Sequence, residues 1–370
     1  MTTMNEKKQK YYPVLDLVRF IAALFIIAIH LFPEGSTTES VGLDTSIPIL
    51  LGESFVYSLL RAAVPIFFVI SSFLLFKKIE NNPENKWRFV GQFCLRLLFL
   101  YLFWYIAALP ITIREVTTYI SQGDSYQLTR YIINTLWKGA PRGFWFLVSL
   151  SFSVLLTNLC NHKKSFLVLT IIAIGMYVYG CLNSAYFGLF TQNENPIAKA
   201  IFITGDYLEL YCSHLQALLF VVFGRLFASH GTFKIKGNLF FILLAFLLMV
   251  GELFLTLYFK LFVFADAFFT LPLFVFFFMN LILSIQSENE SFARIAKKLK
   301  KVGSFSYLFH IQFFYYLHWI LDALGANIFR DNYALLIIPY FVCIFLSFGL
   351  QTLFEHLSQY RPLSFLKCSY

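Results

Sequence analysis

Ten apolar stretches, most of them close to the length that crosses a lipid bilayer, dominate this chain of 370 residues. A transmembrane helix needs about 20 mostly apolar residues. We expect spans at 13–32, 58–76, 89–112, 143–160, 165–182, 208–229, 238–259, 262–285, 303–322 and 333–354. Because 59% of the residues are hydrophobic and only 13% are charged, the surface itself must be apolar. The predicted fold is an all-α polytopic membrane helix bundle, which excludes a soluble enzyme and a disordered chain.

The positive charges predict how this bundle is oriented. If the N-terminus is cytoplasmic, the inner segments hold 19 Lys and Arg residues and the outer segments hold 7. This bias places both termini in the cytoplasm. The first outer loop, 33–54, carries only acids, and the stretch 116–137 is too polar to span, so we expect an interfacial helix in an outer loop there. No tandem repeat or linker divides residues 1–370, which we expect to form one domain.

The cysteines and the formal charge of +9 have simple explanations in this setting. The 6 Cys fall mostly inside apolar runs without a CxxC spacing, so they are typical of small core residues rather than of a disulfide framework. Most of the positive charges serve as topology signals. We therefore predict no metal and no nucleic-acid partner.

Three ionisable side chains stand in the first span, PVLDLVRFIAALFIIAIHLF: Asp16, Arg19 and His30. Each costs at least about 2.5 kcal/mol at membrane depth. Arg19 and His30 are eleven residues apart, about three turns plus roughly 20°, so they share one helix face, and Asp16 lies one turn before Arg19. This polar stripe must face the protein interior or a watery cavity.

Two interpretations of the stripe remain open. In the first, Asp16 and Arg19 form an ion pair at the cytoplasmic interface, and His30 reaches the headgroups at the outer one. In the second, Arg19 holds an anionic headgroup or a cofactor phosphate, and His30 is a general base toward a hydroxyl. The separation of roughly 16 Å along the helix is about the reach of an extended pantetheine arm.

Further motifs follow the Arg-ten-residues-His spacing of the first span. The second span ends in PIFFVISSFLLFKK, which is similar to an FFxxSGF segment with Ser72 in the glycine position. The third span, CLRLLFLYLFWY, is similar to an Arg-Ile-x-Pro segment, with Arg96 as its arginine. Phe99 takes the proline position there, and Phe93 stands where a second arginine is usual.

Three more motifs complete the series. GFWFLVSL opens the fourth span at Trp145, HLQALLFVVFGRLFA ends near Gly224, and VGSFSYLFHIQFF contains His310 as the histidine of a Tyr-Leu-x-His segment. These six motifs, in order over about 300 residues, resemble those of the acyltransferase 3 family of integral membrane acyltransferases.

The resemblance implies an enzyme with a donor and an acceptor on opposite sides of the membrane. It implies a ten-span acyltransferase of the bacterial cytoplasmic membrane that takes an acyl group from acyl-CoA, acetyl-CoA or succinyl-CoA. The acceptor would be a hydroxyl of a surface polysaccharide or lipid-linked glycan, with a glycan synthase or export complex as a possible partner. The chain ends soon after the tenth span, and this architecture is similar to that of the member associated with poly-N-acetylglucosamine adhesin synthesis, for which O-succinyl transfer is expected.

The resemblance also implies roles for individual residues. His30 would deprotonate the acceptor hydroxyl or carry the acyl group itself, and Arg19 would anchor the CoA phosphates. Arg61 and Arg96 would steady substrate charge or the developing oxyanion, with headgroup contact and a helix-packing ion pair as their respective alternatives. His310, about five residues into its span, is expected near the cytoplasmic half, as a substrate ligand or a packing histidine. The other substrate-binding residues are expected to be Trp145 and Asp16.

Other polar residues admit a structural or a functional explanation. His318 and Asp322 either belong to the acceptor site or cap their helix, and the serines of the second and ninth spans are expected to bond a carbonyl one turn back. Glu252 and Asp266 have no obvious partner in the sequence. His214 and Glu209 are typical of residues at the membrane interface.

Two other functions compete with the enzyme. A glycan exporter or flippase would also have about ten spans and intramembrane charges, but the halves of this chain show no internal symmetry of the kind common in transporters. A non-catalytic scaffold in a cell-wall assembly is the second alternative.

Overall fold

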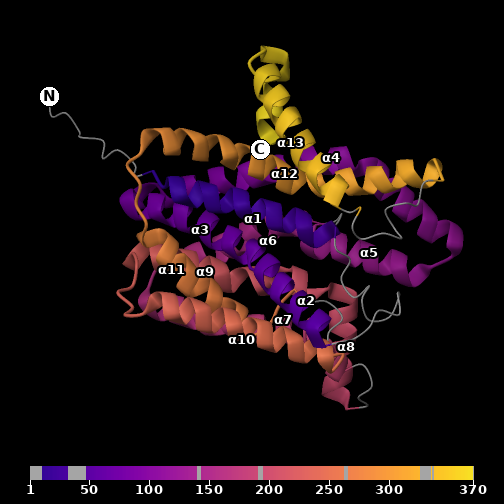
Figure 1. The fold of residues 1–370 in the computed structure, drawn as a ribbon, viewed down its shortest axis with the longest axis horizontal. Coiled ribbons are helices and arrows are strands. Elements are labelled where there is room, and N and C mark those ends of the chain that lie inside the picture. Colours follow the sequence, from indigo (N-terminus) through magenta and orange to yellow (C-terminus); the bar gives the residue numbers. More distant parts are fainter. Residues whose placement is uncertain are drawn as a thin grey trace.

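The computed structural model describes residues 11–31, 47–139, 143–190, 195–261, 266–325, 335 and 337–369. Every regular element in these ranges is a helix, which confirms the predicted all-α class. Most helices run side by side along the longest axis of the molecule, while α8 crosses this direction and α13 rises out of it (Figure 1). By length and composition, six segments of the described chain are able to cross a membrane. The number of ten spans and the cytoplasmic termini stay predictions.

The elements follow one another along the described parts of the chain. Their bounds are α1 Pro13–Leu31, α2 Ile47–Arg61, α3 Ala63–Asn81, η2 Pro83–Asn85, α4 Lys86–Gln122, α5 Ser125–Lys138, α6 Trp145–Leu159, α7 Lys163–Leu182, η3 Phe187–Leu189, α8 Pro196–Leu208, η4 Leu210–Cys212, α9 His214–His230, α10 Asn238–Tyr258, α11 Leu271–Ser284, α12 Glu290–Ala323, α13 Ile337–Leu357 and η7 Arg361–Ser369. The start of the predicted tenth span and most of the first outer loop lie outside the described residues.

Helix α2 differs from the sequence prediction. The expected second span began at residue 58, but a helix already starts at Ile47 and is interrupted at Ala62, so that α3 alone corresponds to that span. Gly52, Glu53 and the serines made this segment look like a loop. In the structure Ser54 donates its hydroxyl to the carbonyl of Leu50 at 2.6 Å, so its polar group is satisfied within the helix.

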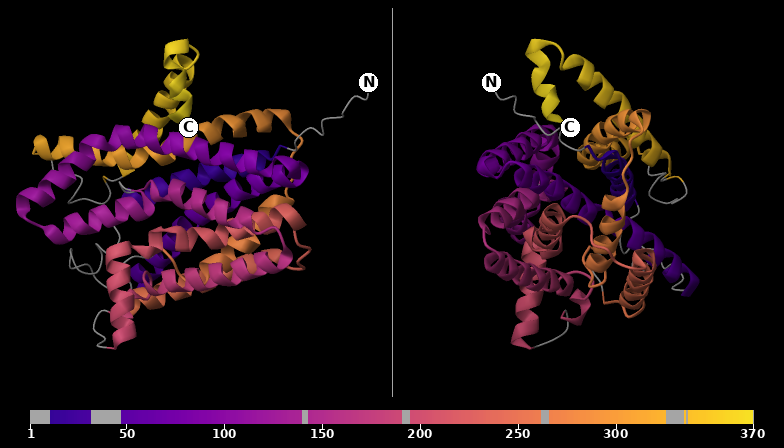
Figure 2. Two further views of the ribbon diagram at one scale, coloured as in Figure 1. Left: turned by 180° about the vertical axis from the view of Figure 1, so that it is seen from behind. Right: turned by 90° about the vertical axis from the view of Figure 1, so that its left-hand side faces the viewer.

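The stretch 116–137 is not one helix. Its first residues continue α4 to Gln122, Gly123 ends that helix in the left-handed conformation, and Asp124 caps α5 by accepting from the amide of Gln127 at 3.0 Å. The 37 residues of α4 extend about 55 Å, well beyond a hydrocarbon core of about 30 Å. The resulting α4–α5 hairpin projects past the neighbouring helices (Figure 2). The interfacial location of this region stays a prediction.

Three later helices begin elsewhere than predicted, and side-chain caps set the starts of two of them. Helix α9 begins six residues late, after Ser213, whose hydroxyl accepts from the amide of Leu215 at 3.2 Å. Helix α11 begins only at Leu271. Helix α12 begins thirteen residues early, after Asn289, whose side chain accepts from the amide of Phe292 at 3.0 Å.

Two close helix pairs form the centre of the bundle. Helices α3 and α9 meet at Gly224, where an added Cβ would lie 2.7 Å from the carbonyl oxygen of Val69 and 2.8 Å from the amide nitrogen of Phe73. Helices α1 and α12 meet at Gly303, where an added Cβ would lie 3.0 Å from the Cα of Phe20. Because both contacts involve backbone atoms, only glycine allows the helices to approach this closely.

The substitution Gly224→Ala tests the first of these contacts. We expect it to cost about 1–3 kcal/mol, because backbone atoms cannot move aside as a flexible side chain can. The matched change Gly251→Ala places a methyl group on α10 where nothing lies within 4 Å, so it should be tolerated. Thermal unfolding of the purified variants in detergent measures the difference, and equal melting temperatures would contradict the close contact.

Candidate active site

A cation cluster lies at the end of the bundle where α1 begins, which we call the Asp16 end. Asp16 is only 2% exposed and accepts from the hydroxyl of Tyr11 at 2.8 Å. The ammonium of Lys300, on α12, lies 3.4 Å from the same carboxylate, and a guanidinium nitrogen of Arg19 lies 3.9 Å from it. The ion pair of Asp16 and Arg19 suggested by the sequence is therefore present, with Lys300 as a third member.

The cluster contains more positive charge than Asp16 balances. Burial lowers the pKa of Lys300, and the nearby guanidinium groups of Arg19 and, more weakly, Arg96 lower it as well, while Asp16 raises it. Arg19 also donates to the hydroxyl of Ser71 at 3.2 Å, and its Nε is buried without a hydrogen-bond partner among the described residues. Guanidinium and ammonium groups arranged in this way are suited to phosphate oxygens.

Two histidines meet at the opposite end of α1, which we call the His30 end. The rings of His30 and His310 lie 5.0 Å apart between centroids. His310 is 1% exposed, its Nδ1 lies 3.2 Å from the carbonyl oxygen of Ser306, and its buried Nε2 has no hydrogen-bond partner in the part of the chain that the structure describes. Because a carbonyl only accepts, Nδ1 carries the proton in the neutral ring, and Nε2 presents a lone pair.

The position of His310 corrects the sequence analysis. The ring was expected near the cytoplasmic half of its span, well below His30. Helices α1 and α12 run parallel from the contact of Asp16 with Lys300, through Gly303 against Phe20, to the two imidazoles. This register makes His310 a neighbour of His30.

Packed side chains separate the two ends along α1 itself. Ala23 and Ile26 lie on the same stripe between Arg19 and His30 and are 0% and 2% exposed. Ala23 faces Gly303 of α12. From Asp16 to Ile26 the stripe therefore faces the protein interior, as predicted, but its middle is filled by apolar packing and His30 at its end is exposed.

Buried polar groups connect the histidines to a further region at the His30 end. The ring of Tyr307 lies 6.0 Å from that of His310, and Cys212 lies near Tyr307. Cys212 in turn lies within electrostatic range of two ion pairs, Arg61 with Asp266 and Lys138 with Glu209.

Arg61 is therefore engaged by a carboxylate of its own chain. It is 7% exposed and forms an ion pair with Asp266, whose backbone carbonyl accepts from the side chain of Gln216 at 2.8 Å. The sequence suggested headgroup contact or substrate charge for Arg61 and found no partner for Asp266. The structure pairs them across 205 residues of chain.

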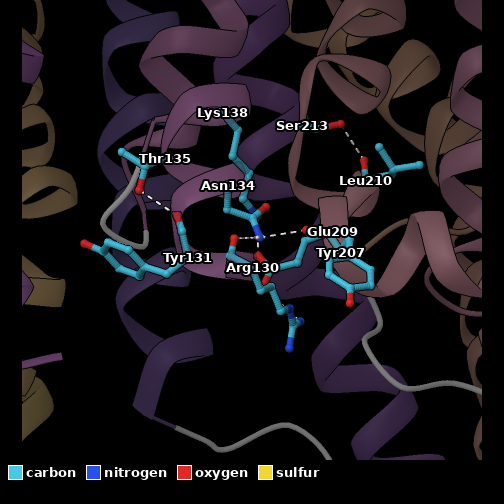
Figure 3. A network of polar contacts seen from close by, with 9 residues as sticks. All are labelled: Arg130, Tyr131, Asn134, Thr135, Lys138, Tyr207, Glu209, Leu210 and Ser213. Atoms are coloured by element: carbon cyan, nitrogen blue, oxygen red, sulfur yellow. Dashed lines mark hydrogen bonds and ion pairs between the residues drawn. The ribbon is translucent and has the colours of Figure 1, made fainter. Parts of the chain in front are cut away.

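Glu209 joins α5 to the end of α8 (Figure 3). Its carboxylate pairs with Lys138 and, at 3.0 Å, with Arg130. Beside it, the amide of Asn134 donates to the carbonyl of Tyr207 at 2.9 Å. Glu209 adopts a left-handed backbone with φ of 42°, an unfavourable conformation for a residue with a side chain.

The other residues predicted from sequence lie outside the two ends or support packing. Trp145 begins α6 and packs against Phe68, with 5.8 Å between ring centroids. Arg96 is exposed on α4, within electrostatic range of the cation cluster. His214 bridges Ser149 and a backbone carbonyl, and the Nδ1 of His318 lies 2.8 Å from a carbonyl in its own helix.

Glu252 has a structural explanation. Its carboxylate accepts from the amide of Thr270 at 2.8 Å and from the hydroxyl of Tyr186 at 2.7 Å. It thereby satisfies a free amide just before α11 begins. This contact explains a partly buried charge for which the sequence offered no partner.

Several residues of the two ends were missed by sequence reasoning. Lys300 counted only as a topology charge, and Arg130 and Lys138 counted only as outer cations. No spacing rule links them to carboxylates that lie 71 to 284 residues away in the chain. Ser306 was expected to bond a carbonyl, but its buried hydroxyl has no hydrogen-bond partner in the described structure.

Metal binding receives no support from these groups. Within the described ranges, no three His, Cys, Asp or Glu side chains converge in a way that could hold a metal ion. The absence of a metal stays a prediction.

The structure thus places cations at one end of the first helix of an all-α membrane bundle and imidazoles at the other end. These features define a membrane protein with a candidate site along its first helix. The chain belongs to the acyltransferase 3 family, because the model of that acyltransferase domain matches residues 12–361. The resemblance drawn from the sequence motifs is thus confirmed.

More distant relatives are larger proteins. An amino-acid racemase of Enterococcus faecalis is 25% identical over 253 residues, which are 66% of this chain and 32% of the racemase. A serine/alanine racemase of Enterococcus gallinarum is 28% identical over 198 residues, which are 51% of this chain and 25% of that protein. The chain thus spans about a third or less of the length of these relatives. No solved structure matches the chain.

The variant Glu209→Gln tests the link between α5 and α8. It leaves Lys138 and Arg130 facing an uncharged amide, and because Glu209 is 27% exposed we expect a loss of about 1–3 kcal/mol rather than the larger cost of a fully buried pair. Melting temperature and limited trypsin digestion after Arg130 and Lys138 measure the effect. Glu84→Gln, at an exposed carboxylate of η2, is the control, and identical behaviour of both variants would refute the link.

Proposed function

We propose that the protein is a membrane-bound O-acyltransferase that moves an acetyl or succinyl group from acyl-CoA to a hydroxyl of a surface or exported polysaccharide. The observation that carries the proposal is the placement of the cation cluster and the His30–His310 pair at opposite ends of α1. One end suits phosphates, and the other suits proton transfer. The family to which the chain belongs supplies the reaction class.

The donor binds at the Asp16 end, which we place on the cytoplasmic side. Arg19 and Lys300 contact the phosphates of CoA, and Arg96 adds positive charge nearby. Asp16 holds these cations in place and keeps their mutual repulsion low in the absence of the donor. The eleven residues to His30 span roughly 16 Å, which allows the thioester to reach the histidines.

The chemistry takes place at the His30 end. An imidazole accepts the proton of the acceptor hydroxyl while the oxygen of that hydroxyl attacks the thioester carbonyl. The C–S bond then breaks, and the CoA thiolate leaves and takes up a proton. His30 is exposed and can meet the acceptor, whereas the Nε2 lone pair of buried His310 allows the pair to share the proton. Brief acylation of His30 is an alternative order of the same steps.

The acceptor approaches from the outer side of the cell membrane in this proposal. Asp266 and Glu209 lie on that side and neutralise most of the charge of Arg61, Lys138 and Arg130, which suits a neutral sugar. Among polysaccharides we favour a poly-N-acetylglucosamine adhesin, made by a synthase complex that this protein would accompany.

Replacing the proposed base separates catalysis from binding. We expect His30→Ala to slow CoA release about 10²–10⁴-fold, because a general base contributes that factor, and to leave the Kd for CoA unchanged. The assay uses purified protein, acyl-CoA and polysaccharide extracted from a deletion strain. His230→Ala, at the exposed end of α9, is the matched control. Full activity of His30→Ala would contradict the proposal, and wild-type protein that moves glycan without releasing CoA would favour a transporter.

Replacing the proposed phosphate ligand should have the opposite effect. A hydrogen bond to a charged group contributes about 1.5–3 kcal/mol, so we expect Arg19→Ala to raise the Kd for CoA about tenfold to a hundredfold. Isothermal titration of the purified protein measures this constant. Arg114→Ala, whose guanidinium stacks over Trp319 on another part of the chain, is the control. An unchanged Kd for Arg19→Ala would refute its role.

A further inference from the structure

We propose that the pantetheine arm of the donor lies in the seam between α1, α12 and α13, where Ser306 and Ser347 bind its amide groups. We name this seam by the helices that enclose it, Pro13–Leu31, Glu290–Ala323 and Ile337–Leu357. The inference rests on the proposed function, since it requires a CoA donor whose phosphates bind at the Asp16 end.

The seam is needed because the direct route is closed. Ala23 and Ile26 fill the stripe between Arg19 and His30, and α12 approaches α1 there so closely that Gly303 has no room for a side chain. An arm that joins the cation cluster to the imidazoles must therefore pass beside α1. The helix that flanks α1 and α12 next to this contact is α13.

The two faces of α13 differ in chemistry. Its outer face carries large apolar side chains such as Phe345 and Phe348, which are 72% and 45% exposed. Its buried face is a stripe of small or polar residues four positions apart, Cys343, Ser347 and Gln351, which the partly exposed Glu355 continues. A lipid-facing helix needs such a stripe only toward protein or a polar ligand.

The ends of this stripe reach both halves of the site. Glu355 pairs with Lys301, the neighbour of Lys300 at the Asp16 end. Cys343 packs with Ile27 of α1 and Phe314 of α12, each within one turn of the two histidines. Because α13 rises out of the direction of α1 and α12 (Figure 1), the distance that the arm has to cover is set by the ten residues from Lys300 to His310 on α12, about 15 Å.

Buried polar atoms mark the middle of the seam. The hydroxyls of Ser306 and Ser347 are 0% exposed; within the described structure that of Ser306 has no hydrogen-bond partner, and that of Ser347 has only the weakly bonding thiol of Cys343 beside it. The Nε of Arg19 and the Nε2 of His310, one at each end, are also unpaired among the described residues. An unpaired buried atom costs about 1–3 kcal/mol, so three of them along one path indicate a ligand that supplies the missing partners.

The arm has the groups that these atoms lack. It carries two amides, each with one N–H donor and one carbonyl acceptor, and a serine hydroxyl can satisfy either. Ser306 lies one turn before His310, so a bond from its hydroxyl to the distal amide would fix the thioester beside the imidazoles. The small residues on the inner face of α13 allow this helix to separate from α1 and α12 with little loss of apolar contact.

Binding of two ligands tests the arm separately from the phosphates. Purified full-length wild-type protein and Ser347→Leu are titrated with CoA and with 3′-phosphoadenosine 5′-phosphate, which lacks the arm. We expect the variant to bind CoA about tenfold more weakly, because it loses a hydrogen bond and gains bulk, and to bind the nucleotide as the wild type does. Thr352→Leu, on the exposed face of α13, should leave both constants unchanged.

The outcomes distinguish the inference from the function on which it rests. If the wild type binds neither CoA nor the nucleotide, the proposed donor is wrong. If the wild type binds CoA and Ser347→Leu binds it equally well, the seam does not hold the arm and the inference falls. Should Ser347→Leu fail to fold, Ser306→Ala removes a hydroxyl without added bulk. This variant must bind CoA several fold more weakly than the wild type and bind the nucleotide equally well.

Discussion

The parallel pairing of α1 with α12 is the constraint on which the site depends. One contact, the backbone of Phe20 against Gly303, sets the distance between the helices, and one ion pair, Asp16 with Lys300, sets their register. Given that register, His30 and His310 meet at the other end without any further device. A shift of one turn along α12 would move His310 by about 5.4 Å and separate the imidazoles.

Sequence reasoning predicted the parts of this site that lie on one helix. Arg19 and His30 share a face because the helix repeat requires it, and the cost of charge at membrane depth predicts that the face is buried. The position of His310 could not be predicted in the same way. Its neighbour depends on where α12 contacts α1, whereas hydropathy reports only where a span enters the apolar region, and α12 begins thirteen residues before that point.

The ion pairs between helices could not be predicted from the sequence either. Glu209 meets Lys138 across 71 residues, and Arg61 meets Asp266 across 205, and no periodic pattern relates such positions. Helix α2 was missed for a related reason. The hydroxyl of Ser54 is satisfied by a hydrogen bond to the carbonyl of Leu50, and this bond forms only in the folded helix. Local patterns thus predict faces and spans, while partners between elements depend on tertiary contacts.

The two ends of the bundle differ in net charge, and this difference gives the site a direction. At the His30 end Asp266 balances Arg61, and Glu209 is shared by Lys138 and Arg130, so three cations meet two carboxylates. At the Asp16 end one carboxylate faces Arg19 and Lys300 together, with Arg96 close enough to affect them. An anion therefore gains more electrostatic energy at the Asp16 end, which favours one orientation of a ligand with phosphates at one terminus and a thioester at the other.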